Sequence, residues 1–450
     1  MNETTDDVAQ TADAPAAPRP ATVLGTERDL LAAVRHASRQ EQFLEVVTPH
    51  EARRRFEGAI DLPPLPSEAA TLAHALGRVL AEDLAAPCDV PGFDRSGVDG
   101  FAVRAADTAG AGDRSPRLLM LNAELIACGH PPVLEVAGGT ASAIATGGAI
   151  PRGADAVVMI EHTQRSGDIV QLDRATKPGQ HVVLRGSEQS ASQTVLGKGT
   201  RFLCSEIAAA AQVGAAAVTV YAKRRIGILS TGDEVVDFTS VPGPFQIRNS
   251  NSASLAAQVQ ALQAEPIALG RANDTCDDLR DKVAAGLRLD ALVISGGVSA
   301  GKYDLVEPVL RDFGAELIFD AVAIRPGKPV VFAICQGKPV FGLPGNPVST
   351  MVTFDLFVRP ALEILSGAEP GPLLFMEAAL VNRLSEKPGL THFLPAKAEY
   401  GEHPLVTPLA WQGSGDIMAM TRANCLLVVP PDRETIEPNE RVLILPRGLW

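Results

Sequence analysis

The sequence is poor in aromatic residues and lacks the spacings typical of a metal site. Aromatic residues make up 4% of its 450 residues. The six cysteines include no CxxC pair and the eight histidines no HxxxH spacing, which argues against a zinc site and a disulfide framework. The most apolar tract, residues 207–222, is interrupted by Gln212 and Gly214 and is too short to cross a bilayer.

Positive charge is also in deficit. Forty Lys and Arg residues against 53 Asp and Glu residues give a net charge of −13, which argues against nucleic acid or an anionic membrane as a partner. A small anionic substrate held by a few local groups is still compatible with this charge. The N-terminus carries Glu3, Asp6 and Asp7 where a secretory signal has basic and then apolar residues, so we expect a cytoplasmic protein.

Hydrophobic residues, at 46% of the chain, are sufficient for several cores, and the length suggests about three domains of about 150 residues each. Residues 1–42 are expected to form a disordered or weakly helical tail, with a weak helix near 27–43. A further helix is expected at 69–76. Short apolar runs between turn residues predict a small β domain over 92–185 and a barrel or sandwich after residue 367.

The clearest architecture lies between residues 225 and 367, where apolar strands alternate with helices. Leu255, Val259 and Leu262 fall on one face of the first helix, as an amphipathic helix requires. This alternation predicts a parallel, doubly wound α/β sheet, whose ligands bind beyond the carboxyl ends of the strands. The expected strands are 225–229, 266–269, 291–295, 330–334 and 340–343.

Two polar loops follow strands of this block. In residues 230–234, hydroxyls, a glycine and two carboxylates suit a polar ligand or Mg²⁺, although the cap and first-turn acids of a helix would give the same pattern. Residues 295–301 contain Gly296 and Gly297, which let backbone N–H groups approach a phosphate, and Asp304 could hold a metal bound there. A tight turn is the alternative, because the loop matches neither GxxxxGK[ST] nor GxGxxG.

Two more loops could bind an oxyanion. Arg325 and Lys328 flank a rigid Pro-Gly turn, which is otherwise an ordinary solvated basic turn. The segment 342–349 places Asn346 as a helix cap and Ser349 in the first turn, where anions bind readily. Outside the α/β block, residues 94–104 and 412–416 form further glycine-rich polar loops.

In this order and spacing, the segments 91–100, 145–158, 230–234, 295–304, 326–329, 343–349 and 412–415 closely resemble the molybdopterin molybdenumtransferase family, which is MoeA in bacteria and the gephyrin E-domain in animals. The resemblance implies an elongated homodimer. Each subunit would have a central MogA-like doubly wound α/β domain, β-rich satellite domains and a C-terminal β-barrel. The implied domains are 47–66 with 224–366 (α/β), 67–84 with 186–223 (linker and dimerisation), 85–185 (β-rich lid) and 368–450 (barrel).

The implied reaction inserts molybdate into adenylylated molybdopterin, with Mg²⁺-dependent release of AMP. The resemblance places catalytic roles on Asp99, Thr146, Glu234, Asp274 and Asp304, and the metal on Glu234 and Asp304. Asp99 and Thr146 would reach the cleft across the dimer interface. The implied phosphate, pterin and oxyanion contacts are Ser230, Thr231, Gly232, Asp233, Gly296, Gly297, Ser299, Arg325, Lys328, Pro344, Asn346, Ser349 and Ser414. The molybdopterin adenylyltransferase would be a further partner.

The chain departs from the family at several cations. Ala321 stands where the family usually has a lysine, and Arg325 stands at a second lysine position. The segment containing Leu390 and Pro395 has no arginine, unlike the corresponding segment of the family. Fewer cations weaken oxyanion capture, unless Lys328 or Arg422 replaces them. The leading hypothesis is therefore an active insertion enzyme. The alternatives are a carrier or scaffold that binds pterin or nucleotide, and an enzyme that inserts another oxyanion such as tungstate.

Overall fold

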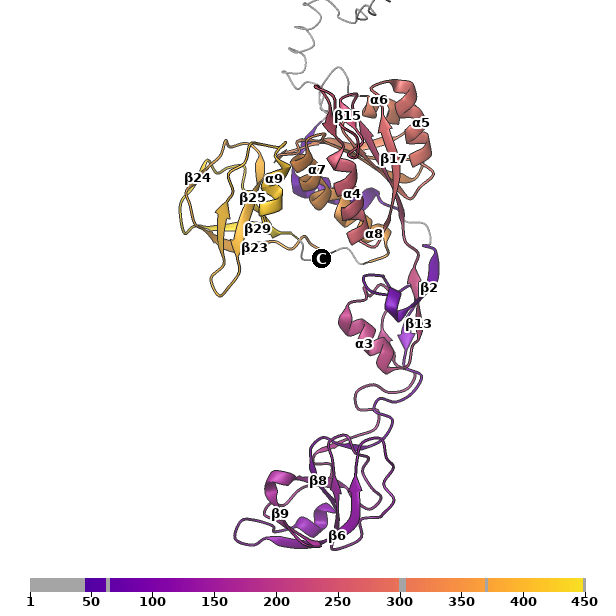
Figure 1. The fold of residues 1–450 in the computed structure, drawn as a ribbon, viewed down its shortest axis with the longest axis vertical. Coiled ribbons are helices and arrows are strands. Elements are labelled where there is room, and N and C mark those ends of the chain that lie inside the picture. The colour runs from indigo at the N-terminus through magenta and orange to yellow at the C-terminus, as the bar shows by residue number, and fades with distance from the viewer. Residues whose placement is uncertain (1–44, 62–64, 299–304, 369–370, 448–450) are drawn as a thin grey trace, which may run out of the picture.

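The computed structural model describes residues 45–61, 65–298, 305–368 and 371–447. The molecule is elongated, with an α/β body and an adjoining β-barrel at one end and a β-rich lobe at the other (Figure 1). A narrow linker lobe around α3 lies between them. In the described part of the chain, no helix combines the length and apolar character needed to span a membrane.

The α/β body is built on a seven-stranded sheet in the order β1-β19-β21-β22-β18-β14-β17. The predicted parallel pairing holds for β14, β17, β18 and β22 but is wrong for β21, which is antiparallel to both of its neighbours. The reason is the two-residue turn Gln336-Gly337, in which both residues have positive φ and close a hairpin between β21 and β22. The strands are β1 (Val46–Val47), β14 (Arg225–Thr231), β17 (Glu265–Ala272), β18 (Ala291–Ser295), β19 (Glu316–Val322), β21 (Pro329–Cys335) and β22 (Lys338–Leu343).

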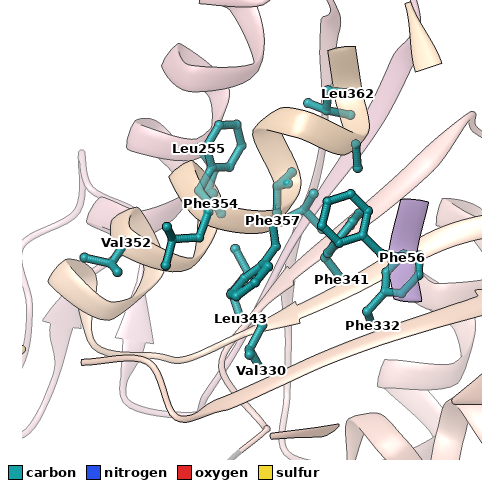
Figure 2. Packing of buried hydrophobic residues seen from close by; sticks show 14 of the residues in the cluster. Phe56, Leu255, Val330, Phe332, Phe341, Leu343, Val352, Phe354, Phe357 and Leu362 are labelled. Carbon is teal, nitrogen blue, oxygen red and sulfur yellow. The ribbon is translucent and has the colours of Figure 1, made fainter. Parts of the chain in front are cut away.

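Helices cover both faces of this sheet. On one face, Phe56 of α2 packs edge-on against Phe332 at a ring distance of 6.0 Å, and Phe332 lies 4.8 Å from Phe341 (Figure 2). On the other face, a second apolar cluster includes Leu279 of α5 and Val309 of α6. The helices are α2 (Pro49–Ala59), α4 (Ser250–Ala261), α5 (Cys276–Gly286), α6 (Val306–Asp312), α7 (Pro347–Thr353) and α8 (Arg359–Leu365), with a π-helical turn η4 (Phe354–Val358) between the last two.

The π-helical turn η4 buries a carboxylate, which gives the body a pH-dependent element. Asp355 is 2% exposed, its Oδ2 lies 3.7 Å from Arg447 Nε, and its Oδ1 accepts a 3.5 Å hydrogen bond from Gln258. Burial raises the pKa of Asp355 to about 6, against the opposing charges of Arg447 and Arg359. Since an unfolded aspartate has a pKa of about 3.9, the folded state binds more protons between about pH 4 and pH 6. The contribution of this group to stability is therefore full below about pH 4 and falls as the pH rises to 6.

Asp355→Asn should remove this pH dependence. We expect the melting temperature of the wild type relative to the variant to fall by several degrees between about pH 4 and pH 6, because each kcal/mol corresponds to about 2–4 °C for a domain of this size. Thermal melts at matched pH values would measure the difference. Asp312→Asn, at an exposed ion pair with Arg280, is the control, and equal slopes for wild type and Asp355→Asn would contradict the prediction.

One helix predicted from the sequence, in the linker lobe, is wrong. Residues 69–76 form the end of strand β2 (Ser67–Thr71) and a single 3₁₀ turn (Leu72–His74) rather than a helix. Strand β2 pairs in antiparallel register with β13 (Ala217–Tyr221), and this tertiary pairing overrides the helical preference of the alanines. The lobe also contains helix α3 (Cys204–Gln212), and β3 (Leu84–Ala85) pairs with β12 (Thr194–Leu196).

The β-rich lobe contains a six-stranded sheet in the order β8-β5-β7-β6-β10-β9. Its chain enters and leaves side by side, since Ala86 N donates to Gln193 O and Ser192 N donates to Ala86 O. Glu188 accepts hydrogen bonds from Arg95 and from Gln212 of α3, which joins the two lobes. The strands are β5 (Gly100–Val103), β6 (Arg117–Ile126), β7 (Thr140–Ile144), β8 (Ala156–Met159), β9 (Thr163–Ser166) and β10 (Ile169–Leu172), with β4 (Arg95–Ser96) pairing β11 (Val182–Val183) outside the sheet.

The C-terminal region is a closed barrel, because β25 pairs with both β26 and β27. A short strand of the α/β body, β20 (Ile324–Arg325), pairs with β25 and places Arg325 opposite His392. This pairing fixes the barrel beside the basic turn of the body. The barrel strands are β23 (Met376–Leu380), β25 (Thr391–Glu399), β26 (Leu405–Pro408), β27 (Cys425–Val429) and β29 (Arg441–Pro446), and α9 (Ile417–Arg422) follows the 411–416 loop.

Candidate functional site

One cleft of about 1120 Å³ lies beyond the carboxyl ends of β14, β18 and β22. All four polar loops predicted in the α/β block contribute to it, and the barrel loop 411–415 forms part of its wall. Of the predicted ligand contacts, the cleft is lined by Ser230, Thr231, Gly232, Glu234, Asp274, Gly296, Gly297, Arg325, Lys328, Pro344, Asn346, Ser349 and Ser414. Asp233 is next to this wall, whereas Ser299 and Asp304 lie outside the described residues.

The loop after β14 packs directly on the glycines after β18. A Cβ on Gly296 would lie 2.7 Å from Thr231 Oγ1, and Gly296 and Gly297 both have positive φ. Glycine is therefore required here by the backbone conformation as well as by the close approach. Ser230 is 2% exposed and its hydroxyl bonds to Ser252 at 2.8 Å, so this hydroxyl holds the loop against α4.

Carboxylates gather where β14 and β17 end. Asp233 N donates to Asp274 Oδ2, and Asp274 N donates to Asp233 Oδ1, both at 3.3 Å. Burial raises the pKa of Asp274, and the charges of Asp233 and Glu234 raise it further, against the Asp233 N–H and Arg271. The described residues contain no cluster of three or more metal-ligating side chains. Glu234 and Asp274 nevertheless supply the carboxylate oxygens that Mg²⁺ prefers. Because these negative charges repel each other, a bound cation would stabilise this part of the cleft.

The basic side of the cleft is built from the body and the barrel together. Gly327 has a positive φ, and a Cβ there would lie 2.7 Å from Thr353 Cγ2, so the turn carrying Arg325 and Lys328 sits tightly on α7. Asn346 Nδ2 donates to Ser414 Oγ at 2.9 Å, and Val348 N donates to Ser414 O at 3.0 Å. The barrel loop is thus hydrogen-bonded to the start of α7.

The three departures from the family's cations do not lie together. Leu390 lines the cleft. Ala321 is 0% exposed within β19, and Pro395 is buried in β25 opposite Leu426, and neither lines the cleft. Of the two suggested replacement cations, Lys328 lines the cleft, but Arg422 does not and donates to Ala410 O.

Asp99 and Thr146 lie together, but in the β-rich lobe rather than at the cleft. Thr146 N donates to Asp99 Oδ1 at 2.7 Å, and this hydrogen bond is the main cause of the lowered pKa of Asp99. The lobe that contains β6 and β8 is at the opposite end of the molecule from α4 and α7 (Figure 1). These two residues do not line the cleft formed by the rest of the chain.

The cleft lining also includes residues that the sequence pattern did not single out, among them Arg248 and Asn249 just before α4 and Asn251 in the first turn of that helix. Asn249 Oδ1 accepts hydrogen bonds from Ser230 Oγ at 3.2 Å and from Ser252 N at 3.0 Å. Asn251 Nδ2 donates to Ser295 Oγ and to Gly345 O, both at 2.8 Å. Asn251 therefore joins two of the polar loops to the start of α4. The available signal was the run of polar residues at 248–252, directly before the apolar face of α4.

A doubly wound body with glycine loops, carboxylates and cations around one cleft is typical of proteins that bind small phosphorylated ligands. Family models agree in three consecutive stretches: the MoeA N-terminal region (domains I and II) over 47–214, a probable molybdopterin-binding domain over 227–364, and the MoeA C-terminal region (domain IV) over 377–446.

Whole-chain relatives agree with these models. The molybdopterin molybdenumtransferase of Bacillus subtilis is 34% identical over 386 residues, covering 84% of this chain and 89% of its own length. The molybdopterin molybdenumtransferase of Nostoc is 33% identical, covering 84% of this chain and 88% of its own length. A crystal structure of the molybdopterin biosynthesis MoeA protein from Pyrococcus horikoshii is 30% identical with a TM-score of 0.75, over 89% of this chain and 99% of that one. The chain belongs to the MoeA family.

Proposed function

We propose that this protein acts in molybdenum cofactor biosynthesis as a transferase that inserts molybdate into adenylylated molybdopterin with release of AMP. The observation that supports this most is the convergence of the family's loops on one cleft with a glycine-lined side and a basic side. The relatives from Bacillus subtilis and Nostoc, which match 84% of this chain, are named molybdopterin molybdenumtransferases. We further propose that the protein works in the cytoplasm and receives its substrate from the molybdopterin adenylyltransferase.

In this proposal the two sides of the cleft have different tasks. Gly296 and Gly297 allow backbone N–H groups to approach the phosphates, and Arg325, Lys328, Ser349 and Ser414 surround the molybdate. Glu234 and Asp274, together with Asp304, would hold Mg²⁺, which when bound neutralises charge on the phosphoanhydride during its cleavage by water. Ser230 and Thr231 fix the loop that carries these acids.

The proposal includes a homodimer, in which the β-rich lobe of one subunit closes the cleft of the other. Asp99 and Thr146 form one hydrogen-bonded unit at the far end of their own subunit, so a second copy would have to bring them to the cleft. Oligomers of identical chains are most often two-fold symmetric, which would complete both clefts at once.

The direct test is to give the purified protein adenylylated molybdopterin, molybdate and Mg²⁺. We expect AMP and molybdenum cofactor to form in equal amounts, with both depending on Mg²⁺. AMP formation without metal insertion would favour the carrier or scaffold function instead, and a preference for tungstate would change the oxyanion. Neither Ala321 nor Pro395 lines the cleft, so the case for the scaffold rests on Leu390.

Leu390→Arg should strengthen molybdate capture. The side chain at this position lines the basic side of the cleft, and a new charge-assisted hydrogen bond to an oxyanion contributes about 1.5–3 kcal/mol. We expect the molybdate concentration for half-maximal insertion to fall about tenfold or more. Leu374→Arg, at an exposed position outside the cleft lining, is the matched control. Equal molybdate dependence in both variants would contradict the assignment of this side to molybdate.

A further inference from the structure

The phosphate side of the cleft contains little positive charge. Its described lining after β14 and β18 consists of hydroxyls, glycines and the carboxylates Glu234 and Asp274. The cations Arg325 and Lys328 come from the turn beside the barrel. Besides the Mg²⁺ of the proposed function, a phosphate here would need a hydrogen-bond donor with positive charge, and among the described lining residues on this side Arg248 is the basic one.

The backbone holds Arg248 next to the acidic loop. Strand β16 (Ile247–Arg248) pairs with β15 (Val235–Val236), so that Arg248 is the register partner of Val236, two residues after Glu234. Ile247 N donates to Glu234 O at 2.8 Å, which ties the two segments together. The position of Arg248 is therefore coupled to that of the proposed catalytic acid.

The guanidinium of Arg248 is anchored on one side. Its Nε donates to Ser240 O at 3.2 Å. In the described part of the chain the two terminal nitrogens have no hydrogen-bond partner, and no carboxylate lies within ion-pair distance of the group. Arg248 is exposed and lines the cleft, so its two terminal nitrogens are a planar pair of donors available to a ligand there.

We propose that Arg248 binds a phosphate of the adenylylated substrate and so determines specificity for phosphorylated ligands. This inference rests on the proposed function, since it names a contact within the same cleft. Two parallel N–H donors match two phosphate oxygens, and the anchored Nε reduces the freedom that is lost on binding. The positive charge also offsets that of Glu234 and Asp274, which line the same cleft.

The test is equilibrium binding of AMP and of adenosine to the full-length protein and to Arg248→Gln. Arg248→Gln should weaken AMP binding about 10- to 100-fold, as expected for loss of a charge-assisted contact, and leave adenosine binding unchanged. Arg248→Lys should recover part of the AMP affinity, because it restores the charge without the planar fork. Arg383→Gln, at an exposed ion pair of the barrel region, should bind both as the wild type does.

The outcomes separate this inference from the proposed function. Unchanged AMP affinity in Arg248→Gln, in a wild type that binds AMP and releases it from the substrate, overturns the inference alone. Equal loss of AMP and adenosine affinity, with a lower melting temperature, overturns it in favour of a structural tie to Ser240. A wild type that binds no AMP and releases none from adenylylated molybdopterin overturns the proposed function as well.

Discussion

Glu234→Gln is expected to lower the rate of AMP release about 10²- to 10³-fold while the protein remains folded. The substitution keeps the shape of the side chain but removes a charge from a cleft where preorganised electrostatics should contribute most to catalysis. The side chain is at the end of β14, where Asp233 and Asp274 already share hydrogen bonds. Single-turnover release of AMP at saturating Mg²⁺ is the measurement.

The Mg²⁺ dependence of the same variant shows whether Glu234 binds the metal or acts only through its charge. If Glu234 helps to hold Mg²⁺, the variant should need a higher Mg²⁺ concentration for half-maximal rate. Glu82→Gln, outside the cleft lining, is the matched control and should leave both quantities unchanged. A Glu234→Gln protein with wild-type AMP release would remove this residue from the mechanism.

Mixed dimers of Asp99→Asn and Glu234→Gln should recover activity that neither variant has alone. If the β-rich lobe of one subunit completes the cleft of the other, each mixed dimer has one site with both substitutions and one site with neither. Random pairing gives half mixed dimers, so about a quarter of wild-type activity should return. Co-expression with two affinity tags, followed by the AMP assay, would measure it.

The control pairs Glu234→Gln with Asp274→Asn, which lie on the same side of the cleft. A mixed dimer of these two has one substitution in each site, so no intact site forms and activity should remain low. If Asp99→Asn and Glu234→Gln also fail to complement, although dimers are present, the lobe does not act across subunits.

Sequence pattern was sufficient where periodicity and turn chemistry were strong. The strands ending at Thr231 and Ser295 and the helix beginning at Pro347 were placed within two residues, because each combines an apolar run with a clear boundary signal. Strand β1 and strand β19 were missed. Strand β1 has two residues and exists only through its pairing with β19, which no local pattern reveals.

Some parts of the candidate site could be predicted from the sequence and others could not. Glycines and acids at strand ends were identified because strand ends in a doubly wound sheet meet at one edge. Arg248 was missed because it belongs to a two-residue strand inside a long loop, where periodicity gives no direction for a side chain. At Ala321 and Pro395 the sequence comparison predicted too much. Both residues are buried in strands, and the loss of a cation affects a ligand only where the side chain would face it.

The adjacent ends of the β-rich lobe make it an insertion in the structural sense. Ala86 is hydrogen-bonded to Gln193 and Ser192, so the chain leaves and re-enters the linker lobe at almost the same point. Removing everything between these residues would leave a gap that a short turn can close, without stretching either strand. The lobe therefore has the geometry of an exchangeable module: its sequence can change by recombination while the body that folds around β14 and β18 stays the same.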